Sequence, residues 1–212
     1  MDEAESSVRE PGPATVTFVT TEHFTLQGAR SQTISESTGR ASIFLASVSG
    51  GLVALGLMAT AEHIGTAFYA LALTLLPVLT FVGLVTFNRV LQNGLEDFNY
   101  ADRIARLRGF YFDHASELDA YLLSVPPGRR LMIQGLVAGT WQHFLTVAGM
   151  VTVITSVLAG ASSALLVAVI ANHSLAGALA AGGAVASVTL AAMIRYQRRA
   201  WAQLEQAVQS RG

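Results

Sequence analysis

Two uncharged blocks decide the fold of this chain: ASIFLASVSGGLVALGLMATA at residues 41–61 and IGTAFYALALTLLPVLTFVGLVTF at residues 64–87. The blocks are 21 and 24 residues long. As α-helices they would span roughly 31–36 Å, enough to cross a hydrocarbon core of about 30 Å. Only Glu62 and His63 separate them, so we expect a tight antiparallel helical hairpin. Helices buried in soluble proteins rarely stay uncharged over such lengths, so the blocks predict a membrane protein.

The composition of the chain agrees with this prediction. Of its 212 residues 52% are hydrophobic and 13% are charged, and the mean hydropathy is +0.48. Soluble domains carry about 25% charged residues. All 13 basic residues are arginine, and the lack of cysteine excludes disulfides and thiolate metal ligands. The acidic N-terminal sequence lacks the basic and apolar regions of a signal peptide, and we expect none.

A second pair of uncharged blocks follows at residues 144–171 and 175–194. The turn between them lies either at residues 172–174 or at residues 160–163, and both versions keep four crossings. We therefore expect an all-α, polytopic membrane protein with four transmembrane helices in two hairpins.

The positions of the arginines predict the topology. All 13 lie before residue 41, within residues 88–143 or after residue 194, and neither turn between spans contains one. Because cytoplasmic loops are enriched in arginine and lysine, both termini and the block 88–143 are expected in the cytoplasm. The chain is then a multi-pass protein of the cell inner membrane, with too little outside to bind an extracellular macromolecule.

The predicted segments are a disordered tail (1–20), a helix leading into the first span (21–40), the first transmembrane hairpin (41–87), a cytoplasmic helical segment (88–143), the second transmembrane hairpin (144–194) and a cytoplasmic tail (195–212). Residues 14–20 are rich in β-branched residues, so we expect an extended lead-in there. Gly94 or Gly109 is expected to separate the second span from the amphipathic helix that follows, which Pro126 and Pro127 end.

That helix carries one apolar stripe. Its members recur at gaps of three and four: Ile104, Leu107, Tyr111, Ala115, Leu118, Leu122 and Val125. Ile104, Tyr111 and Leu118 stand at seven-residue intervals. Either the helix folds back onto its own neighbours, or the stripe is a coiled-coil seam between subunits.

The spans contain small residues four apart, a spacing that lets helices approach closely in lipid. Candidate packing or oligomer residues are Ser47, Gly51, Gly177, Ala181 and Gly182. They either pack the four spans within one chain or join protomers. Pro77 is a candidate kink in the second span.

No catalytic, metal-binding or cofactor-binding motif occurs, so we expect a non-enzymatic protein without a cofactor. The absence of charged residues from the spans argues against a proton-coupled carrier, but leaves open a pore lined by hydroxyl groups. The arginines near the spans are candidate contacts for anionic lipid headgroups: Arg103, Arg106, Arg108, Arg129 and Arg130. With its aromatic neighbours the run RIARLRGFYF at residues 103–112 is also a candidate for a nucleotide ligand, though not for nucleic acid.

Residues 22–125, with the span pattern at 41–87 and the helix at 104–125, resemble the SLATT-type two-span effectors of bacteria. The resemblance is architectural and implies a pore-forming effector of nucleotide-messenger systems. The second hairpin departs from that pattern. The overall layout also resembles four-span proteins of GC-rich bacteria, a resemblance that implies no known activity.

Three hypotheses follow from the sequence. The first is an oligomeric membrane protein whose cytoplasmic helices bind a protein or nucleotide, with pore formation as its sharpest version. The second is an accessory or scaffold subunit of a larger membrane complex. The third, disfavoured by the lack of polar centres, is a small-solute transporter.

Overall fold

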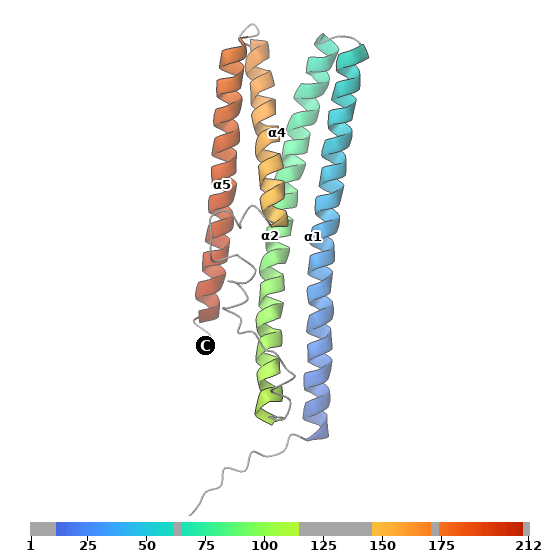
Figure 1. Cartoon of the computed structure of the whole chain (residues 1–212), viewed down its shortest axis with the longest axis vertical. Helices are drawn as coiled ribbons and strands as arrows, with labels where there is room; N and C mark the ends of the chain where they lie inside the picture. The colour runs from blue at the N-terminus through green and yellow to red at the C-terminus, as the bar shows by residue number, and fades with distance from the viewer. Residues whose placement is uncertain (1–11, 62–64, 115–145, 171–173, 210–212) are drawn as a thin grey trace, which may run out of the picture. The chain divides into compact units, whose positions relative to one another are not determined.

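The structure, a computed structural model, describes residues 12–61, 65–114, 146–170 and 174–209. All regular secondary structure in these ranges is α-helical (Figure 1). The helices are α1 (Pro13–Ala61), α2 (Thr66–His114), α4 (Val147–Ile170) and α5 (Leu175–Gln209). All four are long and apolar enough to cross a membrane, which agrees with a four-span protein. The helices α1 and α2 each have 49 residues, or roughly 73 Å, about twice what a bilayer core requires.

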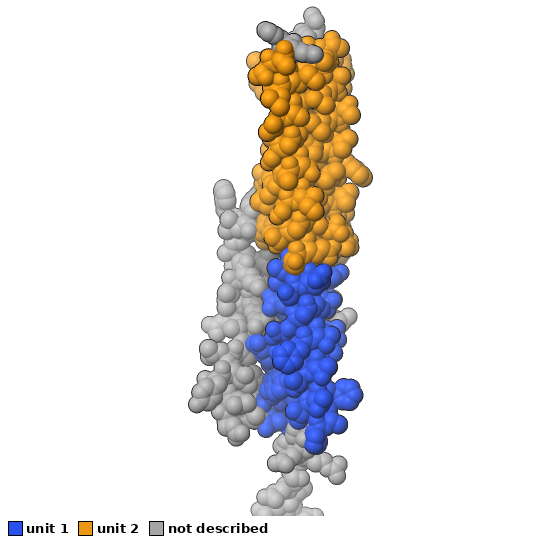
Figure 2. Space-filling view, turned by 90° about the vertical axis from the view of Figure 1, so that its right-hand side faces the viewer, with its two compact units in different colours: residues 1–34, 96–138 blue, residues 35–95, 139–212 orange. Residues whose placement is uncertain are grey.

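The chain divides into two compact units (Figure 2). Unit 1 consists of residues 1–34 and 96–138, and unit 2 of residues 35–95 and 139–212. In the described residues, unit 1 pairs the first part of α1 with the last part of α2. Unit 2 contains the apolar parts of α1 and α2 together with α4 and α5.

Local sequence fixes where three of the helices begin. Pro13 occupies the first position of α1, where its missing N–H costs nothing, and the amide of Thr15 donates to the carbonyl of Gly12 at 2.9 Å. The hydroxyl of Thr146 caps α4 by accepting from the amide of Gly149 at 3.0 Å. The hydroxyl of Ser174 lies 3.4 Å from the amide of Gly177 at the start of α5.

Two sequence-based expectations about helix boundaries are wrong. Residues 14–20 are the first turns of α1, not an extended lead-in, because the cost of β-branched residues in a helix is only a few tenths of a kcal/mol each. The helix α2 continues through both Gly94 and Gly109, since one glycine costs about 1 kcal/mol and does not by itself break a long helix. It also remains helical at Pro77. The tail at residues 1–11 lies outside the described residues.

The open question about the last turn is answered by α4. This helix runs without a break through residues 160–163 and ends at Ile170, and α5 begins at Leu175. Gly160 is used for packing: a Cβ atom there would lie 2.7 Å from the carbonyl oxygen of Gly182 on α5. The two backbones therefore touch where both helices lack side chains.

The core of unit 2 is closed where α1, α2 and α4 meet. Phe44, Val151 and Thr155 are at most 1% exposed. A Cβ atom on Gly83 would overlap the hydroxyl of Thr155 and lie 3.0 Å from Cζ of Phe44. Gly83 thus lets α2 approach both neighbours. A helix packed this tightly leaves no room for an added methyl group.

The outer surface of unit 2 is apolar. Large hydrophobic side chains on all four helices are more than half exposed, among them Ile43, Phe81, Val157 and Val188. Such a surface is unsuited to water and is what lipid or another apolar helix covers.

Replacing Gly83 with alanine is predicted to lower stability by about 1–3 kcal/mol, the usual cost of overpacking a core. The matched control is Gly50→Ala on α1, where an added Cβ meets nothing within 4 Å. Both substitutions gain the same helix propensity, so the difference reports packing alone. Thermal unfolding of the two purified variants in one detergent measures it, and equal midpoints would contradict the packing described here.

Candidate functional site

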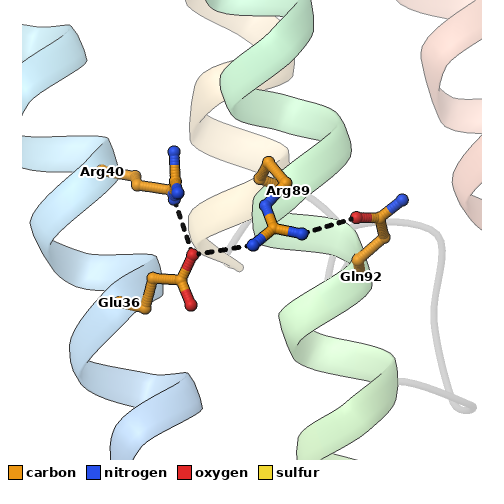
Figure 3. A network of polar contacts seen from close by, with 4 residues as sticks. All are labelled: Glu36, Arg40, Arg89 and Gln92. Atoms are coloured by element: carbon orange, nitrogen blue, oxygen red, sulfur yellow. Dashed lines mark hydrogen bonds and ion pairs between the residues drawn. The ribbon is translucent and has the colours of Figure 1, made fainter.

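A shared carboxylate joins α1 and α2 in unit 2 (Figure 3). Oε1 of Glu36 accepts a hydrogen bond from Nε of Arg40 at 2.8 Å, one turn further along α1. The same oxygen accepts a second hydrogen bond from Nη2 of Arg89 on α2 at 3.1 Å. Nη1 of Arg89 lies 3.4 Å from Oε1 of Gln92. Two guanidinium groups thus share one carboxylate, which leaves a formal charge of +1. We call these four residues the Glu36 network.

The arginines hold the Glu36 carboxyl in its charged form. The hydrogen bond from Arg40, with a further one from Arg89, lowers the pKa of Glu36 below its ordinary value of 4.5. A carboxyl whose pKa is lower in the folded chain stabilises the fold above its unfolded pKa. That contribution is lost only as the pH falls through the lowered pKa, so the network is intact at neutral pH.

The described arginines of unit 2 lie at one end of its helices. In Figure 1 the end of α1, the start of α2, the end of α4 and the start of α5 lie together at the opposite end. About 20 residues, or roughly 30 Å of helix, separate that end from the arginine on each of three helices: Arg40 on α1, Arg89 on α2 and Arg195 on α5. Arg195 is exposed, as are Arg198 and Arg199. This distance matches the thickness of a hydrocarbon core.

Aromatic residues of unit 2 accompany the arginines. The ring of Tyr196, which is 53% exposed, lies 6.3 Å from the ring of Phe87 at the end of the apolar block of α2. The indole of Trp201 faces Gly94, where a Cβ atom would lie 3.7 Å from it. Tyrosine and tryptophan are enriched at membrane interfaces.

The interior of unit 2 contains buried polar side chains. Among them, Thr152 and Ser156 on α4 satisfy their hydroxyls on the backbone of their own helix, at 2.8 Å and 2.7 Å. The hydroxyl of Thr155 lies against Gly83 and has no hydrogen-bond partner within the described residues. Nδ2 of Asn93 is also buried without a hydrogen-bond partner there. Thr152 and Thr155 are fully buried, so the described helices of unit 2 are closely packed at this level.

Unit 1 is joined by ion pairs between α1 and α2. Nε of Arg30 donates to Oδ1 of Asp97 at 2.7 Å, and its Nη2 lies 3.4 Å from Oδ2, a two-pronged contact that is partly buried. Nη2 of Arg103 donates to Glu22 at 3.1 Å. Two-pronged arginine–carboxylate pairs fix orientation as well as distance.

His23 lies at the same α1–α2 contact of unit 1. Its Nε2 is 3.0 Å from Nε2 of Gln27, and its ring meets the ring of Tyr111 edge-on at 6.3 Å between centroids. Nδ1 is buried without a hydrogen-bond partner in the described chain. Burial, with the nearby positive charge of Arg108, lowers the pKa of His23 from 6.5. His23 is therefore neutral at pH 7.

The arginines named from the sequence fall into two groups. Arg103 pairs with Glu22, and Arg106 pairs with Asp102 at 3.1 Å. The positive charge of Arg108 contributes to the lowered pKa of His23. Arg129 and Arg130 lie outside the described residues. In the apolar stripe, Ile104 is 3% exposed and Tyr111 contacts His23, whereas Leu118 lies outside the described residues.

The small residues named from the sequence play different parts. Gly51 packs inside the chain, since a Cβ atom there would lie 2.9 Å from Cδ1 of Leu79, and Gly182 packs on Gly160 and Ala164. Ser47 is exposed and bonds its own helix, with its hydroxyl on the carbonyl of Ile43 at 2.9 Å. Gly177 and Ala181 are half-buried.

The link between Glu36 and Arg89 was not predicted from the sequence. The signal was present, because Glu36 and Arg89 stand at similar distances in sequence from the first turn. In an antiparallel pair of helices, residues equidistant from the turn meet. The same register brings Arg30 to Asp97 and Glu22 to Arg103 in unit 1.

Chemically, the described residues offer cationic donors and hydroxyl groups. No group of three or more histidine, aspartate or glutamate side chains in the described ranges could hold a metal ion. Protein-family models, curated proteins and solved structures yield no match to this chain. The similarity to SLATT-type effectors remains an expectation drawn from the sequence.

The pKa of His23 is predicted to lie below 6.5 and to rise toward that value in the variant Arg108→Gln, which removes the nearby positive charge. A histidine whose pKa is lowered in the folded chain reduces the stability of the fold as the pH falls below its unfolded pKa. Acidification from pH 7 to 5.5 is therefore expected to lower the free energy of unfolding of unit 1. NMR titration of the histidine resonances measures the pKa of His23 in the wild type and in the variant. Arg106→Gln is the charge-matched control, and an equal shift in both variants would contradict the assignment.

Proposed function

We propose that the chain is a non-enzymatic integral membrane protein that crosses the cell inner membrane four times with both termini in the cytoplasm and self-associates within the bilayer. The arginines at one end of unit 2 support this orientation, because arginine-rich ends stay in the cytoplasm. Unit 1, with its ion pairs, then belongs to the cytoplasmic side.

The observation that carries self-association is the division of α5 into two faces of small residues. Ala178 and Gly182 are buried, and Gly182 packs directly on α4. Small residues on the other side of α5 remain exposed: Ala180, Gly183, Ala184 and Ser187. A Cβ atom on Gly183 would meet nothing within 4 Å. Since helices associate in lipid through small residues, a second copy of the chain fits this face.

A pore, as the sharpest version of this function, would form between copies. The described helices of unit 2 are closely packed at the level of Phe44, Thr152 and Thr155. Hydroxyl groups such as that of Ser187 on the exposed face of α5 would then line the pathway. The expected partners are the lipid bilayer, further copies of this chain and a cytoplasmic protein or nucleotide.

A second candidate function is that of a scaffold subunit in a larger membrane complex. Its support is an apolar surface on α1 in unit 1, where Phe18 is 77% and Phe24 is 70% exposed. A monomeric particle in mild detergent that trypsin cleaves rapidly at Arg103 would favour this function over self-association.

Self-association predicts that a single cysteine at Ser187, in this cysteine-free chain, forms an intermolecular disulfide in native membranes. The matched control is Ala178→Cys, which lies on the buried face of α5 and is expected to remain monomeric. Non-reducing gel electrophoresis of oxidised membranes gives the readout. Absence of cross-linking at positions 180, 184 and 187, together with a monomeric mass in detergent, would refute self-association through α5.

The proposed topology predicts that Arg106→Cys is protected from a membrane-impermeant maleimide in intact cells and becomes reactive after permeabilisation. Ser174→Cys, at the turn end of α5, is expected to react in intact cells. The two positions carry opposite expectations, so reversed labelling would show the opposite orientation, whatever the oligomeric state.

A further inference from the structure

The Glu36 network has the charge and the donors to bind an anion. Glu36 neutralises only one of its two arginines, which leaves a formal charge of +1. In the described residues Arg40 donates only its Nε–H to Glu36, although a guanidinium group carries five N–H donors. The side chains of Arg40 and Arg89 are 44% and 46% exposed, so their remaining donors can reach a ligand.

The position of the network points to a lipid. Arg40 directly precedes the uncharged block 41–61, and Arg89 follows the block 64–87 by two residues. One turn toward the apolar blocks, on the same helix faces, lie Ile43 and Val85, which are 69% and 46% exposed. A cationic cluster continued by exposed apolar side chains matches a molecule with a phosphate head and acyl chains.

We propose that Arg40 and Arg89 bind the phosphate of an acidic phospholipid, whose acyl chains lie along α1 and α2. A phosphodiester carries one negative charge, which equals the excess positive charge of the network. Planar guanidinium groups bind phosphate oxygens in two-pronged fashion. Glu36 accepts one hydrogen bond from each arginine, and a carboxyl with a lowered pKa is charged at neutral pH.

The expected lipid preference follows from the same charges. Phosphatidylglycerol has a net charge of −1, whereas the amine or choline of a zwitterionic lipid brings a positive charge close to the arginines. The network therefore favours phosphatidylglycerol over phosphatidylcholine. Each arginine near a membrane surface contributes about 1 kcal/mol of attraction to anionic lipid, a factor of about five in binding.

The test is native mass spectrometry of the purified full chain, equilibrated with equal amounts of phosphatidylglycerol and phosphatidylcholine. The wild type is expected to retain mainly phosphatidylglycerol. The double variant Arg40→Gln/Arg89→Gln is expected to lower the ratio of bound phosphatidylglycerol to phosphatidylcholine by at least about fivefold. The control, Arg30→Gln, removes a positive charge from unit 1 that is held by Asp97 in a two-pronged contact, and it is expected to keep the wild-type ratio.

The variant Glu36→Gln separates lipid binding from helix pairing. It breaks both ion pairs but keeps both guanidinium groups, so the lipid ratio is expected to stay at or above that of the wild type. A fall equal to that of the double arginine variant would overturn the proposal, as would a wild type without lipid preference or an equal fall in the control.

Inorganic phosphate distinguishes a lipid from a free anion. Addition of phosphate in about 100-fold excess over lipid is expected to leave phosphatidylglycerol bound, because the acyl chains contribute to its affinity. Displacement by phosphate would show that the site takes a free anion and would refute the lipid assignment. The lipid ratio is read for each oligomeric species separately, so the result does not depend on whether the chain self-associates.

Discussion

Hydrogen bonding of the backbone in an apolar surrounding is the constraint on which this structure depends. A peptide group in hydrocarbon has no water to bond, and only a helix satisfies every N–H and C=O within one segment. The blocks 41–61 and 64–87 therefore have to be helical, and the helices α1 and α2 extend this geometry beyond the apolar residues for about as long again. The local cost of a glycine or a β-branched residue is too small to interrupt such a helix.

Close approach between helices is the second determinant, and it depends on missing side chains. Hydrophobic burial gives little attraction between apolar helices in lipid, so packing and dispersion hold them together. Gly83 brings α2 against Phe44 and Thr155, and Gly160 and Gly182 bring the backbones of α4 and α5 into contact. Outside the apolar blocks, ion pairs such as Arg30–Asp97 and the Glu36 network take over this role.

Much of the fold, and part of the candidate site, could be predicted from the sequence. The helical class, the four apolar helices and the Glu36–Arg40 pair all depend on local sequence, on composition and helical spacing. The contact between Arg89 and Glu36 could not be predicted in the same way, because these residues are 53 apart in the sequence. Neither could the division of labour among the glycines: Gly51 and Gly182 are buried against neighbouring helices, whereas Gly50 and Gly183 face open space. Equal spacing in sequence says nothing about which face of a helix meets a neighbour.

The sequence by itself determined that this chain is helical and apolar enough to cross a membrane four times, because length and lack of charge act on each segment separately. Only the tertiary structure decided which small residues close the core, that residues 160–163 lie inside a helix, and that one carboxylate serves two arginines from different helices. Those features arise from contacts between segments far apart in the chain, and the register and rotation of packed helices fix such contacts. Local sequence leaves both open.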